Sequence, residues 1–136
     1  MTELMILNST DGPAKGVDDW AAAFFRDADL LHLPTLMNWF ADDIDLRLAN
    51  MPPIIGRAGA QVAFENFWST LKGMSHLREQ LVVDADCAFQ GSIVTYTKLS
   101  GKTVSMPVAS HLRRTGEGRL NRLWIYIDLA PLFAEE

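Results

Sequence analysis

Residues 88–128, AFQGSIVTYTKLSGKTVSMPVASHLRRTGEGRLNRLWIYID, contain three β-rich segments separated by two short turns. The segments span residues 88–99, 102–114 and 119–128, and the turns are Ser100-Gly101 and Thr115-Gly116-Glu117-Gly118. Short glycine-containing turns between β-rich segments are typical of hairpins. This stretch therefore predicts an antiparallel meander of three strands.

Two further strands are predicted upstream of the meander. Residues 76–84 are β-rich and are joined to it by the turn Asp84-Ala85-Asp86. Residues 44–48 alternate between apolar and polar side chains, which is the pattern of a strand with one buried face.

Three helices are predicted in the N-terminal half of the chain. The first follows Asp18 or Asp19, either of which is a suitable N-cap. The second is short, carries Pro34 in its first turn and stops at residues 41–43. The third ends at Gly73, a suitable C′ residue. Helices followed by a run of strands predict an α+β fold with the helices on one side of the sheet.

The bulk composition is that of one globular domain. The chain has 136 residues, of which 49% are hydrophobic and 21% are charged. Residues 1–16 contain two glycines and a proline and show no sustained period, so we expect them to form a flexible N-terminal arm. We expect residues 17–136 to form the single domain.

Charge and apolar patterning argue against several kinds of partner. The net charge is -5, and Glu117 lies among the arginines of the last hairpin, so a basic surface for nucleic acid is not expected. No apolar run approaches the ~20 residues that span a bilayer, and the N-terminus lacks the features of a signal peptide. Cys87 is the only cysteine, so no intrachain disulfide can form. We therefore expect a cytoplasmic protein that binds neither nucleic acid nor membranes.

Three local patterns resemble the nuclear transport factor 2-like superfamily. They are Trp39-Phe40-Ala41-Asp42-Asp43, then Ile55-Gly56-Arg57-Ala58-Gly59-Ala60, then Gly118-Arg119-Leu120 followed by Tyr126-Ile127-Asp128. The match covers residues 17–133 and is best with the SnoaL-like polyketide cyclases. The resemblance implies a cone-shaped, curved antiparallel sheet packed against the three helices, with an apolar pocket at one end.

Catalytic carboxylates of known members are missing from the matching positions. The base of ketosteroid isomerase falls at Leu48, and its protonated aspartate falls at Ser110. The closing-strand aspartate of limonene epoxide hydrolase and of the SnoaL-like cyclases falls at Ile125. Asp128 lies three residues further on, and this odd offset turns it to the opposite face of a strand unless a bulge intervenes.

Histidines are the remaining groups that titrate near neutral pH. His76 opens a strand where the mouth of the cone is expected, and Tyr96 could orient it or donate to an oxyanion. His111 matches the histidine of the SnoaL-like cyclases. The register of ketosteroid isomerase instead turns Ser110 inward and His111 outward, so both registers stay open.

Two functional hypotheses follow. The first is a small-molecule pocket protein that performs cofactor-independent acid–base chemistry, as an isomerase, dehydratase or cyclase, on an apolar and cyclic substrate. Its candidate catalytic residues are His76, His111, Tyr96 and Asp128, with Asp43 also considered, and its ligand-binding wall comprises Trp20, Phe24, Leu48, Phe64, Trp68, Ser110 and Ile125. The second hypothesis is a non-catalytic ligand-binding or dimerisation module of the same fold.

Two expectations concern partners. The histidines and the cysteine have no short ligand spacing, so we expect no metal, and the resembled chemistries imply no cofactor. If Ile125 faces inward, the outer face of the sheet carries Tyr96, Trp124 and Tyr126. Because an exposed aromatic patch usually marks an interface, we expect a homodimer formed through this face.

Overall fold

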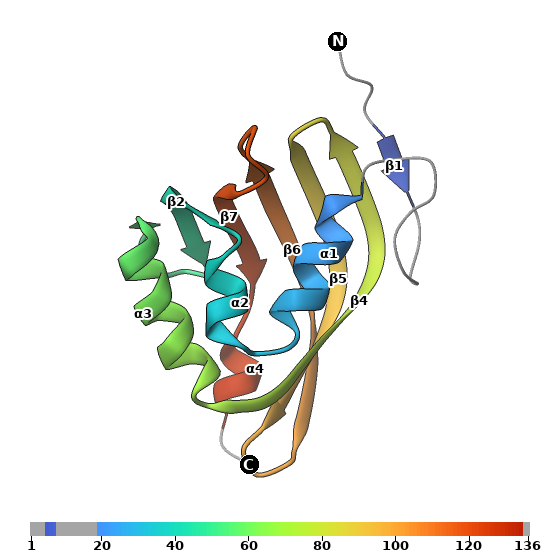
Figure 1. Cartoon of the computed structure of the whole chain (residues 1–136). Helices are drawn as coiled ribbons and strands as arrows, with labels where there is room; N and C mark the ends of the chain where they lie inside the picture. Colours follow the sequence, from blue (N-terminus) through green and yellow to red (C-terminus); the bar gives the residue numbers. More distant parts are fainter. Residues whose placement is uncertain (1–4, 8–18, 135–136) are drawn as a thin grey trace.

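A seven-stranded sheet curves around the helices in the computed structural model, which describes residues 5–7 and 19–134 (Figure 1). The sheet has the strand order β1-β4-β5-β6-β7-β2-β3. The elements in chain order are β1 Met5–Leu7, α1 Trp20–Ala28, α2 Leu33–Met37, β2 Phe40–Leu48, β3 Ile54–Ile55, α3 Arg57–Trp68, β4 Leu71–Asp84, β5 Cys87–Lys98, β6 Thr103–Arg114, β7 Leu120–Ile127 and α4 Ala130–Phe133.

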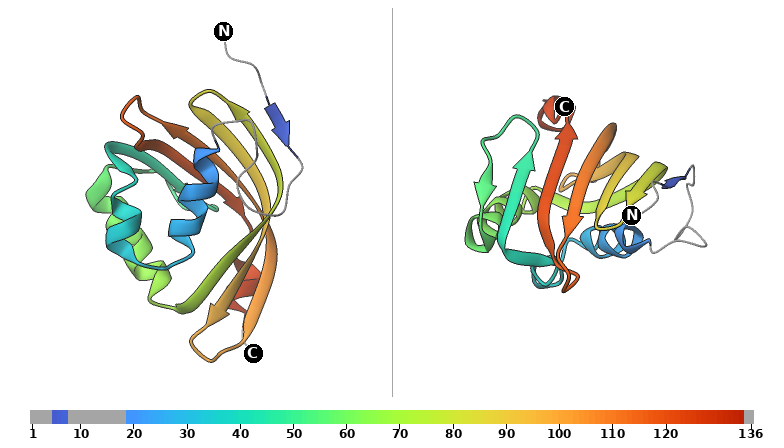
Figure 2. Two further views of the ribbon diagram at one scale, coloured as in Figure 1. Left: turned by 45° about the vertical axis from the view of Figure 1, so that its right-hand side comes forward. Right: turned by 90° about the horizontal axis from the view of Figure 1, so that it is seen from above.

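The three predicted helices lie together on the concave side of the sheet, as the two views of Figure 2 show. The short helix α4 follows β7 at the other end of the chain. This arrangement confirms the predicted α+β fold, a curved sheet closed by helices of the N-terminal half. Strands β4 to β7 are neighbours in chain order and antiparallel, which confirms the predicted meander and its extension to β4.

The sheet is not antiparallel throughout. Strand β2 runs parallel to β7, with Leu46 beside Leu123 and Leu48 beside Ile125. The reason is that β2 enters the sheet from α2 rather than from a hairpin, so no tight turn fixes its direction relative to β7. The parallel pair brings the apolar residues of β2 and β7 onto the same concave face.

A short strand lies within the predicted N-terminal arm. Residues Met5–Leu7 form β1 and pair antiparallel with β4, with Ile6 beside Val82. The rest of the predicted arm lies outside the described residues, and its flexibility stays a prediction.

Helix α1 begins as the sequence predicted. The side chain of Asp19 accepts a hydrogen bond from the backbone N–H of Ala22 at 3.1 Å, which identifies Asp19 as the N-cap. One face of α1 is buried against the sheet: Trp20, Ala21, Phe24, Phe25 and Ala28. The helix ends at Ala28, and Asp29 is its C-cap.

Two predicted helix ends are wrong because strand pairing extends further than the sequence pattern suggested. Residues 41–43 do not end the second helix: α2 stops at Met37, and β2 already begins at Phe40, which pairs with Leu120. Gly73 does not end the third helix but lies in β4 beside Thr97. A Cβ atom at Gly73 would lie 3.1 Å from the Thr97 hydroxyl, so this close strand contact favours glycine.

Strand β4 contains a bulge that decides which side chains face the helices. Arg78 pairs with Ser92 and Gln80 with Gly91, so Glu79 is an extra residue in the ladder. Before this bulge, Met74, His76 and Arg78 face inward, and after it Leu81 and Val83 do.

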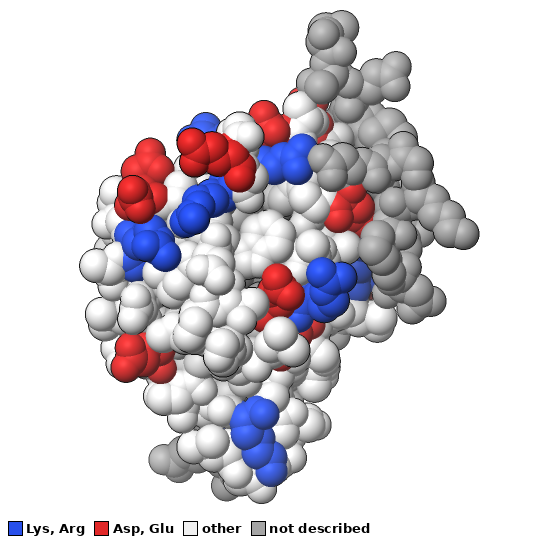
Figure 3. Space-filling view, viewed as in Figure 1, with Lys and Arg blue, Asp and Glu red and all other residues white. Residues whose placement is uncertain are grey.

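Charged side chains of both signs intermingle on the helix-covered face, with an uncharged area between them (Figure 3).

Arginines of the last hairpin have partners within the protein. Arg113 donates to Asn121 at 3.0 Å, and Arg114 donates to Asp86 at 3.1 Å. These arginines contribute to the packing of the hairpin.

Candidate functional site

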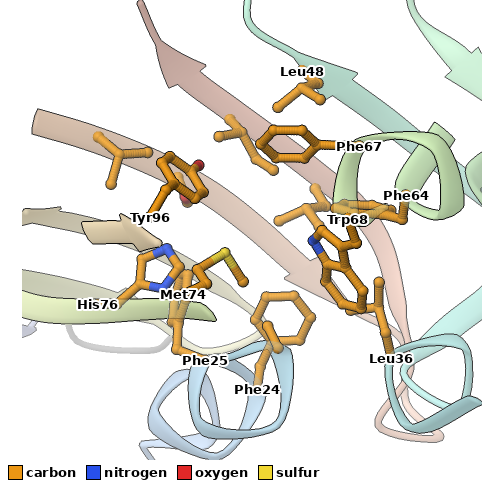
Figure 4. A pocket seen from close by; sticks show the side chains of 15 residues that line it. Phe24, Phe25, Leu36, Leu48, Phe64, Phe67, Trp68, Met74, His76 and Tyr96 are labelled. Atoms are coloured by element: carbon orange, nitrogen blue, oxygen red, sulfur yellow. The ribbon is translucent and has the colours of Figure 1, made fainter. Parts of the chain in front are cut away.

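An apolar cavity of about 40 Å³ lies between the helices and the concave face of the sheet (Figure 4). Helices α1, α2 and α3 and strands β2 and β4 to β7 all contribute to its wall. Its lining residues are Phe24, Phe25, Ala28, Leu36, Leu48, Phe64, Phe67, Trp68, Met74, His76, Tyr96, Val108, Ser110, Leu123 and Ile125. A water molecule needs roughly 10–15 Å³ by this kind of measure, so the cavity holds a few waters or one small group.

Nearly all of the predicted ligand-binding wall lines this cavity. Six of its residues do so: Phe24, Leu48, Phe64, Trp68, Ser110 and Ile125. Trp20 does not line the cavity, because it lies one helical turn before Phe24, at the N-terminal end of α1. Its indole N–H donates to the carbonyl of Ala85 at 3.4 Å, which fixes the start of α1 to the β4–β5 turn.

His76 and Asp29 form a close pair at the edge of the cavity. The Nδ1 atom of His76 lies 2.6 Å from Oδ1 of Asp29, and the backbone N–H of His76 donates to Oδ2 at 3.0 Å. The imidazole also packs against the ring of Phe25, with centroids 4.9 Å apart. The side chain of His76 is only 10% exposed, so its position and orientation are fixed by these contacts.

This pairing determines which nitrogen of His76 can act as a base. A carboxylate can only accept, so with Asp29 ionised the proton of neutral His76 resides on Nδ1. The lone pair is then on Nε2. A histidine held in one tautomer by a carboxylate is the arrangement of a general base, since the carboxylate also stabilises the imidazolium formed on proton transfer.

Tyr96 lies in the same cavity, on β5. The sequence analysis listed Tyr96 among the catalytic candidates and also expected it on the outer face of the sheet. The expectation of an outer position is wrong. Alternate residues Gln90, Ser92, Val94 and Tyr96 are buried on the concave face of β5. Burial, assisted by the negative charge of Asp29, raises the pKa of Tyr96 well above its ordinary value. Its phenol therefore stays protonated and is a hydrogen-bond donor.

Ser110 and Trp68 add two more polar groups to the cavity. Ser110 lies on β6, is 3% exposed and pairs with Ile125 across the ladder. Trp68 lies at the end of α3 and is 7% exposed. Its indole Nε1 is buried and has no hydrogen-bond partner among the described residues. Figure 4 shows this nitrogen pointing into the space between Trp68 and the side chains of His76 and Tyr96.

His111 faces the other side of the sheet. Its ring stacks on Phe89 at 3.9 Å and meets the ring of Trp124 edge-on at 5.5 Å. Burial, together with the positive charges of Arg122 and Arg113, lowers the pKa of His111. The structure thus adopts the register in which Ser110 points into the cavity and His111 points outward.

The remaining carboxylate candidates also lie away from the cavity. Asp128 follows β7, is exposed and accepts a hydrogen bond from the backbone N–H of Ala130 at 3.0 Å. It lines a separate open hollow beside α4. Asp43 is exposed on β2. Of the four catalytic candidates, the cavity therefore brings together His76 and Tyr96.

A second buried polar cluster lies beneath the start of α1. Arg78 donates to both carboxylate oxygens of Asp19, at 2.6 and 3.0 Å. Its Nε donates to Gln90 at 2.7 Å, and Gln90 donates to Ser92 at 2.9 Å. Because a buried charge is tolerated only when it is paired, this cluster fixes α1 to strands β4 and β5.

Asp29 was missed by the sequence analysis, although it carries a signal. It is the C-cap of α1, where the negative end of the helix dipole disfavours a carboxylate. Asp29 therefore requires donors from elsewhere, and His76 provides two of them from 47 positions away. The network of Asp19 and Arg78 was missed because Arg78 lies next to the bulge, which interrupts the alternation of β4.

The described residues contain neither a candidate metal cluster nor a candidate membrane-spanning helix. No group of three or more His, Cys, Asp or Glu side chains there is placed to hold a metal ion. No helix in that part of the chain has the length and apolar character needed to cross a membrane.

Comparisons with known proteins find similarity at the level of structure. No protein-family model and no curated protein matches the sequence. Among solved structures, SalBIII, described as an epoxide hydrolase/cyclase-like enzyme in pyran ring formation in the polyether salinomycin, has 13% identity and a TM-score of 0.70, over 82% of this chain and 90% of its own.

Two further structures extend the similarity. A protein from Shewanella denitrificans OS-217, provisionally assigned as a SnoaL-like polyketide cyclase, has 10% identity and a TM-score of 0.69, over 83% of this chain and 90% of its own. An NTF2-like protein of unknown function from Exiguobacterium sp. 255-15 has 16% identity and a TM-score of 0.66, over 80% of this chain and 98% of its own. At these identities, the similarity establishes a common arrangement of elements.

Proposed function

We propose that the protein is a cofactor-independent acid–base enzyme acting on an apolar, cyclic molecule. The proposal starts from the fold of this chain, which is the nuclear transport factor 2-like fold of the SnoaL-like kind. The reaction class is isomerisation, dehydration or cyclisation. The observation that carries the proposal is the pairing of His76 with Asp29 at the edge of an apolar cavity.

In this proposal His76 is the general base, and Asp29 is its positioning residue. The Nε2 atom of His76 removes a proton from the substrate, and the carboxylate of Asp29 stabilises the resulting imidazolium through Nδ1–H. Tyr96 stays protonated and donates to oxygen on the substrate. The apolar wall excludes water, which strengthens each of these interactions.

The size of the cavity favours the alternative of a non-catalytic module. A cavity of roughly 150 Å³ accommodates benzene, whereas this one measures about 40 Å³. A cyclic ligand therefore requires movement of lining side chains. Phe67 and Met74 are only partly buried and are the side chains best placed to move.

Deuterium exchange distinguishes the two functions. The protein is incubated in D₂O with a panel of apolar cyclic ketones, lactones and hydroxyketones, and mass spectrometry follows deuterium uptake at carbon. We expect exchange in at least one compound, and a loss of about 10²–10⁴-fold in its rate for His76→Ala. The matched control is His32→Ala, because His32 is exposed and bonded to Thr35. No exchange across the panel, or equal rates for His76→Ala and the native protein, would contradict the proposal.

The proposal includes a homodimer formed through the outer face of β5, β6 and β7. Phe89 and Tyr126 are 47% and 56% exposed on this face, next to the rings of His111 and Trp124. Two buried donors there, Arg122 Nε and Trp124 Nε1, have no hydrogen-bond partner among the described residues. A second copy would cover the aromatic rings and provide acceptors.

The cytoplasmic location and the absence of a cofactor stay predictions.

A further inference from the structure

The polar groups of the cavity differ in what they can offer a ligand. Trp68 has an indole N–H, which can only donate, whereas the hydroxyls of Tyr96 and Ser110 can both donate and accept. Among the described lining residues, His76 provides an acceptor nitrogen. Three of these four groups can donate, so the wall is able to bind an acceptor oxygen of a ligand.

The indole N–H of Trp68 stands out among the tryptophans of the described chain. Trp39 donates to Asp27 at 3.0 Å, and Trp20 donates to Ala85 at 3.4 Å. The indole N–H of Trp124 also has no acceptor among the described residues, but it belongs to the outer face of the sheet. The donor of Trp68 is shielded from water, and a buried donor without a partner costs free energy that a suitable ligand restores.

We propose that Trp68 Nε1 binds the oxygen of a substrate carbonyl, so that the substrate is an uncharged cyclic ketone or lactone. The statement rests on the proposed function and narrows it. Trp68 reaches the cavity from α3 and His76 from β4, on opposite sides of the space between them (Figure 4). A ring bound between them directs its oxygen toward Trp68 and an adjacent C–H bond toward His76.

The choice of a neutral carbonyl follows from the surroundings. An ammonium group would find only neutral acceptors, because the carboxylate at the edge of the cavity, Asp29, is already bonded to His76. A carboxylate would lose its hydration in an apolar cavity whose described lining residues include no arginine or lysine. A carbonyl oxygen needs only the donors that are present.

The geometry also assigns Trp68 a part in the proton transfer. When His76 Nε2 takes the proton, the C–H electron pair forms a C=C bond, and the C=O π pair moves to oxygen. The N–H of Trp68 donates to this enolate oxygen, and the proton held by His76 returns to another atom of the ring system. Charge develops on oxygen in this step, so the hydrogen bond is stronger in the transition state than in the bound ketone.

A pair of ring compounds tests the inference without requiring catalysis. Cyclohexanone and methylenecyclohexane have nearly the same shape and differ in the oxygen that Trp68 would bind. In a ¹H–¹⁵N spectrum, we expect cyclohexanone to move the Trp68 indole signal downfield and methylenecyclohexane not to do so. Trp68→Phe, which keeps an aromatic ring, should reduce the preference for the ketone by about 3- to 10-fold.

Two controls separate the possible failures. Trp124→Phe removes an indole N–H outside the cavity and should leave the preference unchanged, and thermal unfolding verifies that both variants are folded. Equal binding of the two rings in native protein and in Trp68→Phe would overturn the inference alone, since His76-dependent deuterium exchange would be unaffected. If neither ring binds, the proposed apolar binding cavity fails, and this inference fails with it.

Discussion

The Nδ1 atom of His76 lies 2.6 Å from Oδ1 of Asp29, although the two residues are 47 positions apart in the chain. The contact joins the C-terminal end of α1 to β4, the long strand that crosses beneath it. The proposed base and its proposed positioning carboxylate are therefore held by two different layers of the fold.

Asp29→Asn should remove the tautomer preference of His76. An amide can accept or donate, so the proton of neutral His76 is no longer restricted to Nδ1. We expect ¹⁵N chemical shifts of His76 to show Nδ1–H in the native protein and a mixture of tautomers in the variant. The rate of substrate deprotonation should fall with them. Unchanged tautomer populations in the variant would contradict the idea that Asp29 sets the tautomer of His76.

His111→Ala and Asp128→Asn should retain activity once a substrate is found. Both side chains lie away from the cavity, His111 on the outer face and Asp128 beyond the end of β7. Rates within about 3-fold of the native value are expected, against a loss of about 10²–10⁴-fold for His76→Ala. If Asp128→Asn is inactive while His76→Ala works, then the carboxylate-driven chemistry of SnoaL-like cyclases applies after all.

Arg78→Met should destabilise the protein by about 3–5 kcal/mol, because it breaks the buried ion pair between Arg78 and Asp19. Urea unfolding measures the loss. Combining it with Asp19→Asn, which neutralises the carboxylate, should cost less than the sum of the two single changes. Additive losses would show that the two residues are not coupled.

Stability should fall in mildly acidic solution because of His111. Its pKa is lowered in the folded protein, so the folded state favours the neutral ring while the unfolded chain titrates near 6.5. The contribution is therefore complete above pH 6.5 and is lost as the pH falls through the lower folded pKa. His111→Gln should show a smaller loss of unfolding free energy between pH 7.5 and pH 5 than the native protein.

Sedimentation should detect a dimer at micromolar concentration, about twice the 15.2 kDa of one chain. Replacing Phe89 and Tyr126 by serine removes the two exposed rings of the proposed interface and should shift the protein toward monomers. The cavity residues are not altered, so the His76 tautomer serves as a control for folding. A native protein that sediments only as a monomer would rule the interface out.

Much of the fold could be predicted because local patterns agree with it. The turns at Ser100-Gly101 and residues 115–118 lie between the strands they were expected to join. The residues Phe64 and Trp68 of the third helix are buried, as their spacing indicated. The register of β6 was left open between Ser110 and His111, and in the structure Ser110 is in phase with the buried residues Val108 and Leu112.

The centre of the site could not be predicted from such patterns. His76 was identified because histidine is uncommon and titrates near neutrality, but its partner Asp29 resembles any acidic residue after a helix. Nothing local indicates that residues 47 positions apart meet. Trp68 could be assigned to the wall, whereas the lack of an acceptor for its N–H depends on every neighbour at once.

The extra residue Glu79 sets a condition on how β4 can vary. Its side chain is exposed, so the position accepts many replacements. Deleting Glu79 would remove the bulge. The side chains of β4 would then alternate between the two faces without interruption along the whole strand. Either His76 and Arg78 would turn to solvent, or Leu81 and Val83 would. Related sequences can therefore exchange the amino acid here freely while preserving the length of the strand.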